Sequence, residues 1–209
     1  MSLARLVRWS GLAVLVSGIL RITRGVLDFI FIPAGMALST QATTDIWMVL
    51  ALLTVVIFMI LVPGLIGLYV HQSSKAGVLG LVAFPVALVG TMLGFATFWS
   101  GYLYAPELAQ SAPSLLDNGS PRLMLLGFLI PFLLFYVGWL LFGLVSVLAR
   151  VFPRWAGALL MLGVPLILLQ GLVFLPLLGD VVFAAGLVWM GYALWSEKGE
   201  TVAQAEPTL

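Results

Sequence analysis

Residues 46–70, IWMVLALLTVVIFMILVPGLIGLYV, form an apolar run without a single charged side chain. A helix needs about 20 such residues to cross the hydrocarbon core of a bilayer, so this run predicts a transmembrane helix. The rest of the 209-residue chain has the same character, with 63% hydrophobic and 8% charged residues and a mean hydropathy of +1.20. Soluble domains contain about 25% charged residues. The composition therefore predicts a protein surrounded by the lipid bilayer.

Six apolar segments can be traced along the chain, separated by short polar connections. They predict an all-α, polytopic membrane helix bundle that forms a single transmembrane domain over residues 1–195. Residues 196–209 are polar, and we expect them to form a disordered cytoplasmic tail. The six predicted transmembrane helices span residues 9–32, 46–70, 77–99, 123–149, 155–175 and 181–195.

Proline, glycine and polar residues mark bends and connections. Pro63 and Pro85 lie inside spans and predict kinks, because neighbouring helices or water can satisfy the carbonyls that they free. Residues 101–122 contain three prolines and an Asp-Asn-Gly sequence, which predict an external loop. A short interfacial helix over 107–116 is the alternative. Asp180 precedes the sixth span and is expected to be its N-cap.

Basic residues are distributed unequally between the two sides of this bundle. With the N-terminus inside, Arg122 lies outside. The front of the first span, where Arg5 and Arg8 precede the apolar residues 11–20, also resembles a signal peptide. No small-x-small cleavage site follows before Arg21, so we expect this segment to remain part of the span. The excess of cytoplasmic basic residues follows the positive-inside rule and predicts that both termini are cytoplasmic. The cytoplasmic residues are Arg5, Arg8, Lys75, Arg150, Arg154 and Lys198.

Several chemistries are excluded by what the sequence lacks. With no cysteine and one histidine, the chain cannot form disulfides, thiolate metal sites or, alone, a bis-histidine haem. It contains no phosphate-binding glycine loop, no His-Glu-x-x-His and no Gly-x-Ser-x-Gly sequence. We therefore expect neither an enzyme nor a bound cofactor or metal. Because the basic residues do not cluster, nucleic acid is not expected as a partner.

The first span carries polar residues at helical spacing. Ser17, Arg21, Arg24 and Asp28 fall on one face of a helix with 3.6 residues per turn. Small residues beside this face would let a second helix approach closely, so we expect the face to point into the bundle and the first helix to be central. The small residues include three glycines seven residues apart, Gly11, Gly18 and Gly25.

Charged side chains in these positions need partners or water, since each costs roughly 2.5–3.5 kcal/mol near the bilayer centre. Arg24 and Asp28, four residues apart, can pair. Arg21 would then lie about 18 Å into the membrane, at 1.5 Å per residue, without an evident counter-charge. The remaining candidates are weakly polar groups in the spans and carboxylates that would have to fold inward: Thr54, Thr91, Tyr136, Ser146 and Gln170, and Asp45, Glu107, Asp117 and Asp180.

Two interpretations of the arginines stay open. In the first, Arg21 and Arg24 bind an anionic group, either a lipid headgroup or a carboxylate or phosphate of a small solute in a water-filled cavity. In the second, Asp28 bridges both arginines and Arg21 snorkels through a thinned bilayer.

Different functions follow from these interpretations. A cavity at Arg21 would suit a non-enzymatic protein that binds or moves an anionic lipid or small solute. A polar helix satisfied by protein contacts would suit an accessory or assembly subunit with a membrane protein partner. A lipid-modifying enzyme would need titratable groups that converge from distant helices.

Three short motifs lie near the ends of predicted spans. They are Arg8-Trp9-Ser10-Gly11, Pro63-Gly64-Leu65-Ile66-Gly67 and Phe152-Pro153-Arg154-Trp155-Ala156-Gly157. In these motifs and in its layout, the chain resembles the small, uncharacterised six-helix membrane proteins that are common in bacteria. The resemblance implies a multi-pass protein of the inner (plasma) membrane and carries over no activity.

Overall fold

The computed structural model describes residues 3–169 and 174–196, and in this part of the chain all regular secondary structure is helical. The elements are α1 (Leu3–Phe31), α2 (Leu38–Ala42), α3 (Trp47–Ser111), α4 (Pro113–Asp117), α5 (Pro121–Met124), the π-helical turn η1 (Leu125–Leu129), α6 (Ile130–Ala149), α7 (Arg154–Leu168) and α8 (Leu175–Ser196).

Element α3 consists of two antiparallel helices that meet at Gly77. Gly77 has φ 57° and ψ −159°, a conformation that glycine adopts more readily than any residue with a Cβ. Aromatic pairs show the hairpin, because Tyr69 stacks on Phe84 near the turn and Trp47 contacts Tyr102 at the far end. Residues 47–76 form the first limb and residues 78–111 the second. Both limbs continue as helix through their internal prolines.

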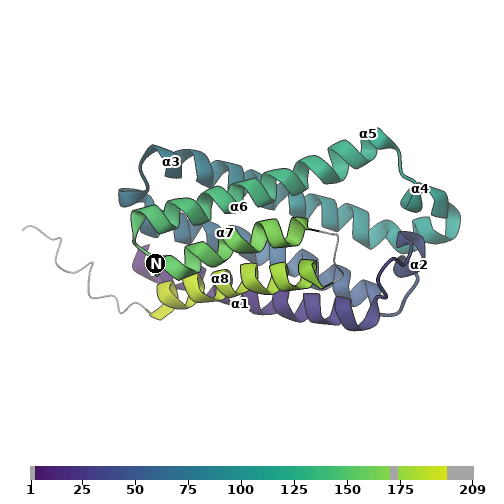
Figure 1. Ribbon diagram of the computed structural model, residues 1–209, viewed down its shortest axis with the longest axis horizontal. Helices are drawn as coiled ribbons and strands as arrows, with labels where there is room; N and C mark the ends of the chain where they lie inside the picture. The colour runs from purple at the N-terminus through teal and green to yellow at the C-terminus, as the bar shows by residue number, and fades with distance from the viewer. Residues whose placement is uncertain (1–2, 170–173, 197–209) are drawn as a thin grey trace, which may run out of the picture.

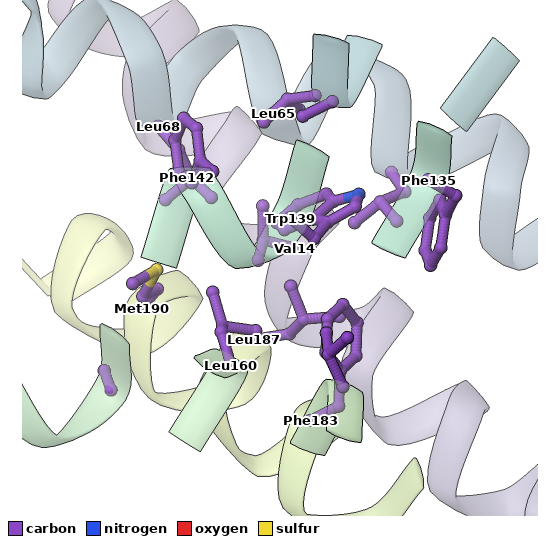
Figure 2. Close-up of a cluster of buried hydrophobic side chains, with 14 of the residues drawn as sticks. Val14, Leu65, Leu68, Phe135, Trp139, Phe142, Leu160, Phe183, Leu187 and Met190 are labelled. Atoms are coloured by element: carbon purple, nitrogen blue, oxygen red, sulfur yellow. The ribbon is translucent and has the colours of Figure 1, made fainter. Parts of the chain in front are cut away.

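The long helices lie roughly along one axis (Figure 1), and their contacts close a ring. Along this ring α1 packs on α8, α8 on α7, α7 on α6, α6 on α3, and α3 again on α1. Figure 2 shows the core that this ring encloses, where side chains of five elements meet. Each element contributes buried side chains to this core, for example Val14 of α1, Leu65 of α3, Trp139 of α6, Leu160 of α7 and Phe183 of α8.

Three of the described helices are long and apolar enough to cross a membrane: Trp47–Ser111, Leu125–Ala149 and Leu175–Ser196. Large apolar side chains also cover the outside of the bundle, among them Met59, Val78 and Trp155. An apolar exterior over an apolar core is compatible with a membrane protein, since soluble monomers rarely expose large contiguous apolar patches.

The predicted external loop over 101–122 is wrong. The second limb of α3 continues as a helix through Pro106 to Ser111, and α4 begins at Pro113 and α5 at Pro121. Proline is favoured at the first position of a helix, where its missing N–H costs nothing. Pro113 and Pro121 therefore start helices instead of ending them. The alternative of a helix over 107–116 is closer, although a break at Ala112 divides it.

The boundary between the fifth and sixth predicted spans also needs correction. Helix α8 begins at Leu175, so Asp180 lies inside the helix and is not its N-cap. Helix α7 ends at Leu168, and the predicted end of the fifth span falls partly on residues 170–173, outside the described residues. The predicted tail also lies outside them, apart from Ser196, which ends α8.

Short helices close one end of the bundle, called here the α2–α4 end. The backbone N–H and hydroxyl of Ser39 both donate to the carboxylate of Asp117, at 2.8 and 2.7 Å. The hydrogen bond from the Ser39 hydroxyl, and to a lesser extent the one from its backbone N–H, lowers the pKa of Asp117 below its ordinary value. This link between α2 and α4 is therefore kept at neutral pH and lost only as the pH falls through that lowered value.

Candidate functional site

Arg21 is held by side chains from two other helices. Its Nε donates to Oδ1 of Asp180 at 3.0 Å, its Nη2 donates to the same oxygen, and Nη2 also donates to the hydroxyl of Tyr136 at 3.0 Å. The guanidinium also lies 4.9 Å from the ring centre of Phe183 and 5.7 Å from that of Phe135, within cation–π range. The counter-charge of Arg21 is thus a carboxylate 159 residues away in the sequence.

Sequence reasoning named both partners as candidates but could not choose them. Tyr136 stood among the weakly polar groups, and Asp180 among the carboxylates that would have to fold inward. Asp180 reaches Arg21 because α8 begins earlier than predicted, which places the carboxylate in the second turn of the helix and not at its tip.

Arg24 and Asp28 form the expected i,i+4 pair, but loosely. Nη2 of Arg24 lies 3.7 Å from Oδ1 of Asp28, beyond hydrogen-bonding distance. Within the described part of the chain, Nε of Arg24 is buried and has no hydrogen-bond partner. Asp28 therefore does not bridge both arginines as the second interpretation requires, and Arg24 keeps unused donors.

The small-residue face of α1 points into the bundle, as predicted. A Cβ on Gly11 would lie 2.9 Å from the carbonyl oxygen of Gly191, so α1 and α8 touch through their backbones. Ser17 is fully buried and donates to the carbonyl of Ile57 at 3.4 Å. Ser17 thus joins α1 to α3, one turn away from Arg21.

A cavity of about 180 Å³ lies beside both arginines, and we call it the arginine cavity. Its charged lining consists of Arg21, Arg24 and Asp180. A water needs about 10–15 Å³ of such space, so several could enter. The remaining lining is hydroxyl-bearing, aromatic or apolar: Thr54, Ile57, Phe58, Gly94, Thr97, Phe98, Tyr102, Phe128, Pro131, Phe132, Phe135 and Tyr136.

A second cavity of about 450 Å³, the vestibule, lies at the α2–α4 end. It is lined by the end of α1, the following turn and the start of α8, and its lining includes Asp28, Gln41 and Asp180. Asp180 lines both cavities, whereas Arg24 lines the arginine cavity and Asp28 the vestibule. The two ion pairs therefore lie at the boundary of the cavities: both guanidinium groups line the arginine cavity, and the carboxylates of Asp28 and Asp180 line the vestibule, Asp180 lining both cavities.

The chemistry open to this site is charge recognition. In the described residues, no group of three or more His, Asp or Glu side chains could hold a metal ion. Titratable groups do converge from three helices, namely Arg21, Tyr136 and Asp180, but they are bonded to one another. Both hydrogen bonds from Arg21 go to Oδ1 of Asp180, whereas the buried Nε of Arg24 has no partner and can still donate.

Comparisons with protein-family models, with curated proteins and with solved structures found no match of any kind.

Proposed function

We propose that the protein crosses the bacterial inner membrane six times, with both termini in the cytoplasm. The six spans would be α1, the two limbs of α3, η1 with α6, α7 and α8. Helix α1 has 29 residues and is about 43 Å long at 1.5 Å per residue, enough to cross a core of about 30 Å. The N-terminal end of α1, the turn at Gly77 and the α6–α7 turn lie at one end of the bundle (Figure 1), which favours the cytoplasmic assignment of their basic residues.

This topology predicts opposite accessibility for two sites. Because the chain has no cysteine, Ser74→Cys beside the Gly77 turn and Asn118→Cys after α4 each introduce a unique thiol. A membrane-impermeant maleimide is expected to label Asn118→Cys in intact spheroplasts and Ser74→Cys only after permeabilisation. The reverse pattern would invert the topology, and labelling of both sites in intact spheroplasts would rule out the hairpin as a membrane-spanning unit.

We further propose that the protein is a non-enzymatic receptor or carrier for an anionic group, a carboxylate or phosphate, which binds in the arginine cavity. The observation that carries this proposal concerns Arg24. Its Nε is buried beside the cavity without a hydrogen-bond partner, and its Nη2 lies 3.7 Å from Oδ1 of Asp28. An anion at this point would gain charge-assisted hydrogen bonds that Asp28 does not make. The anion would also compete with the carboxylates of Asp28 and Asp180 for the two guanidinium groups.

The test compares single variants in phosphatidylcholine nanodiscs by native mass spectrometry, with inorganic phosphate and lysophosphatidate as probes. Arg24→Gln is expected to weaken binding roughly 10- to 100-fold, the value of one or two hydrogen bonds to a charged group. Asp28→Asn removes the competing carboxylate and is expected to tighten binding. Arg154→Gln, which changes an exposed arginine at the start of α7, at the opposite end of the bundle from η1 (Figure 1), serves as the control.

Arg24→Gln suits this test better than a change at Arg21, because Arg21 is locked into the fold by Asp180 and Tyr136. If Arg24→Gln binds both probes as tightly as the wild type, the proposal is wrong. The Arg21 network would then favour the second function, an accessory or assembly subunit, since protein contacts alone satisfy the deepest charge of α1.

A further inference from the structure

The arginine cavity has its mouth beside η1. Most of the residues that line it are buried or half-buried, but Phe128 of η1 is 42% exposed. At the same place the hydroxyl of Thr97, in the second limb of α3, donates to the carbonyl of Gly127 at 2.8 Å. The mouth therefore lies between the second limb of α3 and η1, on the side of the bundle and away from the vestibule.

The wall of this mouth touches α3 through the Thr97–Gly127 hydrogen bond but is otherwise largely exposed. Residues 124–130 are exposed on every side of the helix, and a Cβ on Gly127 would meet no atom within 4 Å. All of these residues except Gly127 are large and apolar, and the segment runs along the upper edge of the bundle in Figure 1. A π-helical turn of this kind within an α-helix frequently marks a functional site. In a bilayer, the mouth would open towards acyl chains and not towards water.

Polarity changes along the cavity from one end to the other. Arg21, Arg24 and Asp180 supply its charges, whereas phenyl rings line the way to the mouth: Phe58, Phe98, Phe128 and Phe132. A small hydrophilic anion would leave these rings facing water. A ligand with an acyl chain would cover them and would place its anionic group on the guanidinium side.

We infer that the ligand is an amphiphile, with an anionic headgroup bound at Arg24 and an acyl chain that leaves between α3 and η1 into the surrounding lipid. This inference rests on the proposed anion site and specifies the class of molecule that uses it. Entry from the side requires no passage through the vestibule, so the Arg21–Asp180 pair can stay closed while the ligand binds.

The experiment uses palmitate with a photoreactive diazirine in the second half of its chain, added to the full-length protein in phosphatidylcholine nanodiscs. Peptide mapping is expected to find the label on residues 94–98 of α3 and on η1. Arg24→Gln should reduce this labelling at least tenfold, whereas Arg154→Gln should leave it unchanged. Unlabelled palmitate should suppress it, and acetate or inorganic phosphate at equal concentration should not.

The outcomes separate this inference from the anion site itself. If acetate or phosphate competes as well as palmitate, or if the chain label falls on residues 29–35 of the vestibule, the ligand is not an amphiphile that uses the side mouth, and the anion site at Arg24 stands. If Arg24→Gln labels as strongly as the wild type, the anion site fails together with the inference.

Discussion

Asp180→Ala is expected to lower the free energy of unfolding by about 3–5 kcal/mol, the usual result of removing one partner of a buried ion pair. The change leaves the guanidinium of Arg21, only 9% exposed, without its carboxylate and with the Tyr136 hydroxyl as a remaining partner. Steric trapping or a denaturant titration in bicelles would measure the loss. The same change should disorder the contact between α1 and α8, because the pair joins those two helices.

Two further variants show whether burial causes this effect. Arg21→Met combined with Asp180→Leu removes both charges and should recover most of the loss, since an apolar pair of similar size often replaces a buried ion pair without cost. Asp28→Asn disrupts the loose pair with Arg24, in which the Asp28 side chain is 41% exposed, and should cost less than about 1 kcal/mol. Equal losses in Asp28→Asn and Asp180→Ala would contradict this account.

Gly138→Val is expected to prevent α3 and α6 from packing. A Cβ on Gly138 would lie 2.4 Å from Cα of Ala87, and a Cβ on Gly90 would lie 2.3 Å from the backbone N of Phe135. These are contacts with backbone, which cannot move aside as a flexible side chain can. The expected loss is about 3 kcal/mol or more, at the upper end of the range for overpacking. Thermal unfolding in detergent would measure it.

Gly101→Ala is the control, because Gly101 lies in α3, the element that packs on α6, but has no atom within 4 Å of its would-be Cβ. Alanine there should be neutral or stabilise the helix by up to about 1 kcal/mol, since glycine has the lower helix propensity. If Gly138→Val unfolds no more readily than Gly101→Ala, the close crossing of α3 and α6 does not determine stability.

The sequence predicted features that depend on local spacing. Apolar runs and helical periodicity identified α1 and the helix that ends at Ala149, and serine and glycine at seven-residue spacing identified the buried face of α1. The Arg24–Asp28 pair followed from a separation of four residues. Each of these inferences needed information from a single helix.

The errors arose where distant contacts decide the structure. The partners of Arg21 lie on α6 and α8, and no spacing rule connects residues 115 and 159 positions apart. The helix over 101–111 continues where its proline predicted a loop, because Trp47 and the short α2 and α4 elements pack against it around Ala105. The cavities were equally hidden, since they exist only between elements that the chain brings together.

The ring arrangement places the carboxylate for Arg21 on a helix made much later. At about 5–20 residues per second, the 159 residues between Arg21 and Asp180 take on the order of ten to thirty seconds to translate. In the proposed membrane topology, the newly made α1 would hold an unneutralised cation during that interval, and the insertion machinery or lipid headgroups would have to shelter it. The first helix would then be fixed in its place only when α8 arrives, so biogenesis of this protein should be unusually sensitive to ribosome stalling before α8.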